Sequence, residues 1–168
     1  MKQYAPLSRL VHRYSWLIIT WTVITLICSA EHAGFMIYVL AVPCLLYAAI
    51  RYLCNLRSPE KRDKYLHFTC IILLSSSFVA GVHIWRHHQA RTYADHIVAK
   101  LFEYQATHGN LPAKLDDIPE LASDGKHPHM LFYSNDKEAP FLLYAATFVP
   151  FEAWHYDFKE KLWIYDYD

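Results

Sequence analysis

The sequence predicts a membrane protein in which three transmembrane helices are followed by a small extracytoplasmic α+β domain. Hydrophobic residues make up 54% of the 168 positions, above the roughly 45–50% that is usual for soluble chains. This excess lies in three apolar blocks before Arg86, whereas the residues that follow are mixed, charged and rich in aromatic side chains. In this second half the hydrophobic period changes from 3.6 to 2, which indicates a helix followed by strands.

The first apolar segment covers residues 14–30 and follows an N-terminal stretch with basic but no acidic residues. Its length is close to the lower limit of the roughly 17–25 residues that cross a membrane. A signal peptide is the alternative, because the small residues Cys28-Ser29-Ala30 resemble a signal-peptidase site. Threonine and tryptophan dilute the segment, which favours a retained helix.

Two further transmembrane segments are predicted at residues 35–53 and 66–85. Pro43 lies in the middle of the second segment, and neighbouring helices of a bundle can satisfy the carbonyl group that such a proline leaves free. Ser77 and Gly81 are four residues apart in the third segment. They therefore share one helix face, which predicts close helix packing at this position.

The loops between the segments predict the orientation of the chain. The N-terminal stretch and the loop between the second and third segments are basic, whereas the first loop carries only Glu31 and His32. The positive-inside rule then places the N-terminus in the cytoplasm. An odd number of spans puts residues 86–168 outside, which in a Gram-negative bacterium means an inner-membrane protein with a periplasmic domain.

The predicted domain at residues 86–168 begins with an amphipathic helix. Apolar side chains recur at helical spacing from Gln89 to Gln105, and Gly109, Asn110 and Pro112 then end the helix. A short second helix is expected at residues 113–118. Period-2 alternation predicts short strands at residues 130–134, 141–148, 153–158 and 161–167. An antiparallel meander packed on the amphipathic helix would bury their aromatic rings.

A resemblance to a known family is carried by the run Tyr104-Gln105-Ala106-Thr107-His108-Gly109-Asn110-Leu111-Pro112-Ala113-Lys114-Leu115. With an apolar helix before it and a small sheet after it, this run resembles the soluble part of type II pseudopilins and type IV pilin-like proteins. The resemblance covers about residues 66–168 and implies one long helix whose first half is buried in the membrane. No prepilin leader is recognisable and two apolar segments precede the helix, so the resemblance implies the fold rather than filament assembly.

The 11 histidines of the chain raise the question of metal binding. His83 and His87 are four residues apart and are the best metal-ligand candidates. No cysteine or acidic residue stands at ligand spacing beside them, so neither metal nor cofactor is predicted. Haem between His12 and His67, or between His32 and His83, would need a better cage than three helices provide.

Two other function classes are disfavoured. The sequence contains no recognisable set of nucleophile, base and orienting residue and no glycine-rich phosphate loop, so we do not expect an enzyme. The formal net charge of zero disfavours nucleic-acid binding.

The favoured hypothesis is therefore a protein that works by contact, with membrane lipid around its helices and a protein partner at its exported domain. An immunity protein that inhibits a membrane-acting or periplasmic toxin fits this description. A structural pilin-like component of an envelope or secretion assembly is the alternative, and a metal or haem carrier is the third. Aromatic side chains often anchor interfaces, so Trp154, His155, Trp163 and Tyr165 are the expected binding residues. Which sheet face they occupy depends on strand register.

Overall fold

The computed structural model describes residues 12, 14–122, 127–135 and 139–166. The chain forms two compact units, Met1–His83 and Ile84–Asp168. Helix α4 (Pro59–His108) is a single helix of 50 residues and contributes to both units.

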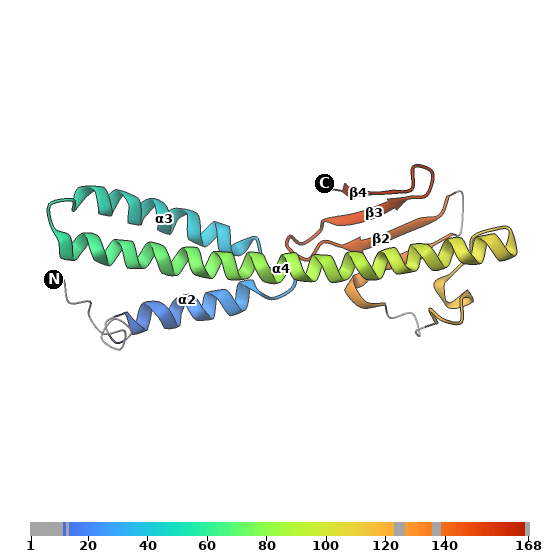
Figure 1. Ribbon diagram of the computed structural model, residues 1–168, viewed down its shortest axis with the longest axis horizontal. Coiled ribbons are helices and arrows are strands. Elements are labelled where there is room, and N and C mark those ends of the chain that lie inside the picture. The colour runs from blue at the N-terminus through green and yellow to red at the C-terminus, as the bar shows by residue number, and fades with distance from the viewer. Residues whose placement is uncertain (1–11, 13, 123–126, 136–138, 167–168) are drawn as a thin grey trace, which may run out of the picture. The chain divides into compact units, whose positions relative to one another are not determined.

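The first unit contains α2 (Ser15–Cys28), α3 (Met36–Cys54) and the first part of α4, as Figure 1 shows. In the described part of the chain, α3 and α4 are long and apolar enough to cross a membrane. Helix α2 has 14 residues, fewer than the about 20 that a crossing helix usually needs. The described residues of this unit contain three helices, as predicted, while the number that cross a membrane stays a prediction.

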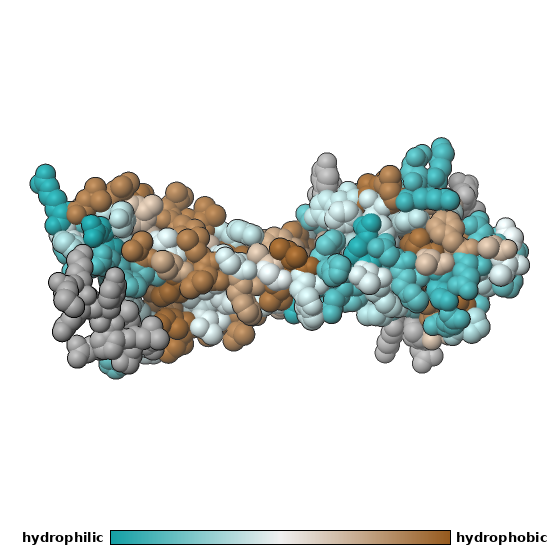
Figure 2. Space-filling model, in the orientation of Figure 1, coloured by the Kyte–Doolittle hydropathy of each residue, from teal (hydrophilic) through white to brown (hydrophobic). Residues whose placement is uncertain are grey.

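Side chains from all three helices form the core of this unit. The buried residues are Trp21 and Cys28 of α2, Ile37 and Ala41 of α3, and Ile72 and Val79 of α4. Helix α3 continues through Pro43 to Cys54. Most of the remaining apolar side chains are exposed, and hydrophobic residues gather over these helices in Figure 2.

Helix α4 begins earlier than the predicted third segment. Residues 59–65 were predicted to belong to the loop before this segment. That prediction is wrong, because the helix starts at Pro59. Proline suits the first helical position, where its missing N–H costs nothing. The N–H of Arg62 donates to the carbonyl of Ser58 at 3.0 Å, and Glu60 lies in the first turn, where a negative charge is favoured. At the other end Gly109 has a φ of 84°, which confirms the predicted left-handed stop.

The predicted close-packing face at Ser77 and Gly81 is wrong within this chain. Both residues are exposed, and a Cβ added at Gly81 would meet no atom within 4 Å. The side of α4 that faces the other helices carries Ile72, Val79 and His83 instead. Larger side chains therefore fill the space between these helices, and Ser77 and Gly81 lie outside this contact.

The second unit contains the remainder of α4 and a four-stranded antiparallel sheet. Its strands are β1 (Phe132–Ser134), β2 (Phe141–Ala145), β3 (Ala153–Asp157) and β4 (Leu162–Asp166), in the order β1-β2-β3-β4. Short 3-10 helices, η1 (Leu115–Asp117) and η2 (Pro128–Met130), lie between α4 and β1. The predicted amphipathic helix and antiparallel meander are confirmed, with shorter strands. The short helix expected at residues 113–118 is the 3-10 helix η1. Tyr167 of the last predicted strand lies outside the described residues.

The sheet packs on α4 through its aromatic face. Residues paired directly across antiparallel strands point to the same side, and the register pairs Tyr144 with Trp154, Trp154 with Tyr165, and Tyr156 with Trp163. The core consists mainly of Ala90, Ala94, Ile97, Val98 and Leu101 of α4, together with Leu142, Tyr144, Tyr156 and Trp163 of the strands. These α4 positions are the ones that the helical spacing predicted.

Candidate functional site

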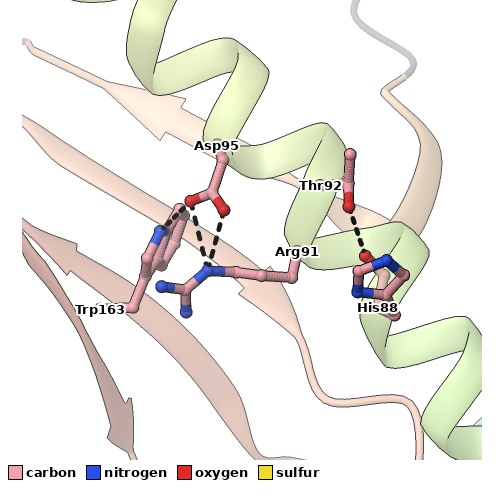
Figure 3. Close-up of polar contacts among 5 residues, drawn as sticks. All are labelled: His88, Arg91, Thr92, Asp95 and Trp163. Atoms are coloured by element: carbon pink, nitrogen blue, oxygen red, sulfur yellow. Dashed lines mark hydrogen bonds and ion pairs between the residues drawn. The ribbon is translucent and has the colours of Figure 1, made fainter.

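Arg91 and Asp95 join α4 to the aromatic face of the sheet (Figure 3). One carboxylate oxygen of Asp95 accepts hydrogen bonds from Trp163 Nε1 at 2.8 Å and from Arg91 Nε at 3.2 Å. The Arg91 guanidinium lies 5.0 Å from the Trp163 ring and 6.0 Å from the Trp154 ring, within the range of cation–π attraction. This arrangement fixes β3 and β4 against the helix.

His87 belongs to the same aromatic packing. Its ring centroid lies 6.1 Å from that of Tyr144 and 5.4 Å from that of Trp154. Burial lowers the pKa of His87, and the positive charges of Arg91 and His88 lower it further. The neutral form of the imidazole is therefore favoured here.

The two histidines proposed as metal candidates make other contacts. In the first unit, buried His83 donates a hydrogen bond from Nε2 to the carbonyl of Cys28 at 3.0 Å. Within the described ranges, no group of three or more His, Cys, Asp or Glu side chains is arranged to hold a metal ion.

The four expected binding residues are divided between the two faces of the sheet. Trp163 is 8% exposed, so the expectation of an exposed ring is wrong, because the pleat of β4 turns it towards α4. Trp154 and Tyr165 lie on the same face as Trp163, with ring centroids 4.9 Å apart, and are partly accessible. Only His155 points to the opposite side.

That opposite side carries a row of side chains that crosses all four strands. The register pairs Phe132 with Leu143, Leu143 with His155, and His155 with Ile164. Phe132 is 55% exposed and Ile164 37% exposed. With the neighbouring exposed residues Phe141 and Leu162, this row forms what we call the open face, made of Phe132, Phe141, Leu143, His155, Leu162 and Ile164.

Acidic side chains border the open face on β3 and β4. The Oδ2 atom of Asp166 lies 3.9 Å from His155 Nδ1. Asp157 accepts hydrogen bonds from the backbone N–H groups of Lys159 at 2.8 Å and Glu160 at 2.9 Å. These bonds lower the pKa of Asp157, so its carboxylate is charged at neutral pH. The open face thus has an apolar centre and a charged border, the usual composition of a protein interface.

A signal for the open face was present in the sequence. Phe141 and Leu143 alternate with Leu142 and Tyr144, and Leu162 and Ile164 alternate with Trp163 and Tyr165. These strands are apolar on both sides, while only one amphipathic helix was predicted to cover them. One apolar side was therefore bound to remain uncovered by that helix.

Comparisons of the chain with models of protein families, with curated proteins and with solved structures give no match.

Proposed function

We propose that this chain is a membrane-anchored protein that binds another protein through the open face of its sheet. The observation that carries the proposal is the row from Phe132 to Ile164, which places apolar side chains of β1, β2 and β4 on one accessible surface. Covering apolar surface contributes roughly 25 cal/mol per Å². Binding of a partner that covers this face would be favoured by that free energy, because the apolar side chains leave water.

Membrane anchoring is supported by the exposure of the apolar helices. Only 17% of the most apolar window of α3, and of that of α4, is buried within the chain. A core helix of a soluble protein would be mostly covered, so these helices need another apolar environment. Lipid supplies it, and helices already satisfy their own backbone hydrogen bonds. The basic loop before α4 then favours a cytoplasmic N-terminus and an exported second unit.

The first partner class to test is a membrane-acting or periplasmic toxin, with this chain as the immunity protein that inhibits it. Such a toxin arrives on the side of the membrane where the proposed topology puts the open face. An inhibitor of this kind acts by occupying a surface and needs no catalytic group. The apolar centre and acidic border of the open face suit that role.

A structural pilin-like component of an envelope or secretion assembly is the second candidate. The observation in its favour is α4, whose first part is apolar and whose last part packs on an antiparallel meander. This is the arrangement that the resemblance of Tyr104–Leu115 implies. Partners of such a component would be other assembly proteins rather than a toxin.

The proposal is tested by isolating partners of the tagged full-length chain after detergent extraction from its own host. Ile164→Glu places a charge on the open face, and Ala99→Glu places the same charge on an exposed position of α4. We expect one dominant partner with the wild type and with Ala99→Glu, and at least about tenfold less with Ile164→Glu, equivalent to about 1.4 kcal/mol.

Circular dichroism of each purified variant shows whether the fold is retained. Undiminished recovery of the same partner by a folded Ile164→Glu protein would overturn the open-face proposal. Recovery of secretion or pilus proteins in place of a toxin would favour the second candidate.

A further inference from the structure

The first unit contains a cavity of about 440 Å³, within the size range of small-molecule sites. It lies where the beginning of α2, the second half of α3 and the first turns of α4 come together. The lining residues that matter here are Tyr14, Trp16, Tyr47, Lys64, Tyr65 and Phe68.

One part of the cavity wall offers hydrogen-bond donors. Lys64 supplies an ammonium group, and Tyr14, Tyr47 and Tyr65 supply phenol groups. Arg51 Nε donates to the Tyr65 hydroxyl oxygen at 3.1 Å, and its guanidinium lies 5.7 Å from the Tyr65 ring. The Tyr65 hydroxyl also shares a hydrogen bond with Tyr47, so Arg51 and the two phenols form one polar group at the wall. Ammonium and hydroxyl donors together suit the oxygens of a phosphate group.

The other part of the wall is apolar and aromatic, formed by Trp16, Leu17 and Phe68. A water-soluble anion would not pack against such a wall. The glycerol and the first carbons of an acyl chain of a lipid would. The combination of cationic, phenolic and apolar groups therefore matches an amphiphile with a phosphate headgroup.

We propose that this cavity binds the headgroup of an anionic phospholipid. The inference rests on the membrane anchoring in the proposed function and deepens it. Lys64 belongs to the basic stretch between α3 and α4, which the proposed topology places at the cytoplasmic surface. Basic pockets between membrane helices at that surface are suited to anionic headgroups, and tyrosine and tryptophan are enriched at this depth.

The charges around the cavity support an anionic ligand. The stretch from residue 57 to residue 64 contains four basic residues and two acidic ones. The excess of two positive charges in this stretch makes the local field positive beside Lys64.

The test measures the melting temperature of the purified full-length chain in a neutral detergent. Phosphatidylglycerol, phosphatidylcholine or inorganic phosphate is added in increasing amounts. Lys64→Gln removes the ammonium group of the cavity, and Lys61→Gln removes a charge from the same helix turn without touching the cavity lining. We expect phosphatidylglycerol to stabilise the wild type and Lys61→Gln equally, with about a tenfold higher concentration needed for Lys64→Gln.

Equal responses of Lys61→Gln and Lys64→Gln to phosphatidylglycerol would overturn the proposal. Equal stabilisation by phosphatidylcholine would show that the headgroup charge is not read, and an equal effect of inorganic phosphate would replace the lipid by a free anion. If Lys64→Gln fails to fold, Tyr65→Phe removes one donor instead and should weaken the response in the same direction. Partner recovery by Lys64→Gln separates failure at this cavity from failure at the open face.

Discussion

At the residue scale, Trp163 combines a buried ring with a hydrogen bond to a charged partner. Trp163→Ala removes both, and we expect it to lower the free energy of unfolding by about 3–5 kcal/mol. Its neighbour Ile164 points to the open face and is 37% exposed, so Ile164→Ala should cost at most about 1 kcal/mol. Chemical unfolding of the detergent-solubilised chain measures both. Equal losses would contradict the assignment of Trp163 to the buried face of β4 and of Ile164 to its exposed face.

Phe151 is a residue whose backbone is strained and whose side chain stabilises nothing. It has a φ of 68° and is 99% exposed. Glycine removes a penalty of about 1–2 kcal/mol for the left-handed conformation. It also lowers the free energy of unfolding by about 0.5–1 kcal/mol, because it makes the unfolded chain more flexible. We therefore expect Phe151→Gly to raise the free energy of unfolding by about 0.5–1 kcal/mol.

Phe151→Ala is the matched control, because it removes the ring and keeps the Cβ that causes the strain. It should leave the free energy of unfolding nearly unchanged. A gain with alanine as large as the gain with glycine would attribute the effect to the exposed ring rather than to the backbone.

At the element scale, β1 holds the chain that leaves the end of α4. The Tyr133 hydroxyl donates to the carbonyl of Pro112 at 2.8 Å, and Asn135 Nδ2 donates to the carbonyls of Leu111 and Pro112, both at 3.2 Å. Tyr133 is buried, and this burial, with a smaller effect of the Asp117 charge, raises its pKa to about 12. The connection between helix and sheet thus depends on a neutral phenol.

This pKa predicts a loss of stability at alkaline pH. The unfolded chain releases the Tyr133 proton near pH 10, before the folded chain does, so the contribution is complete below pH 10 and is lost between about pH 10 and 12. We expect melting temperatures to fall less steeply in this range for Tyr133→Phe. Burial also raises the pKa of Tyr93, Tyr144 and Tyr156, so some decline persists. An unchanged slope in Tyr133→Phe would remove Tyr133 from the explanation.

The helix after Gln89 could be predicted from the sequence because its apolar spacing is a local pattern. The same holds for the stop at Gly109 and for the alternation of the strands. The covered side of β4 could not be predicted, since Leu162 and Ile164 on one side compete with Trp163 and Tyr165 on the other. The choice depends on packing against α4, which involves residues far away in sequence. The outward position of Ser77 and Gly81 depends on packing in the same way.

At the scale of the whole molecule, composition indicates which segments need an apolar environment, and the basic loop predicts their orientation. We expect alkaline phosphatase to be active when fused to the C-terminus of the full chain and inactive when fused after Asn55. Activity after Asn55, or inactivity at the C-terminus, would contradict the proposed topology.

A third fusion, after Ala33, tests whether the 14-residue α2 crosses the membrane. Activity at this position means that α2 exports the chain that follows it, and a fusion protein of full, uncleaved size then shows that α2 is retained as a crossing helix rather than removed as a signal peptide. Inactivity would contradict the proposed crossing of α2. Fluorescent protein fusions at the same positions should give the reverse pattern, because they fold only in the cytoplasm.

The central claim is that the open face contacts a protein partner in the living cell. A photo-crosslinking amino acid placed at Ile164, and at Ala99 as the control, tests this directly in the full-length chain within its own host. We predict one dominant covalent adduct from position 164 and none from position 99, with the adducted protein identified by mass spectrometry. No adduct from position 164, or the same adduct from both positions, would contradict the claim.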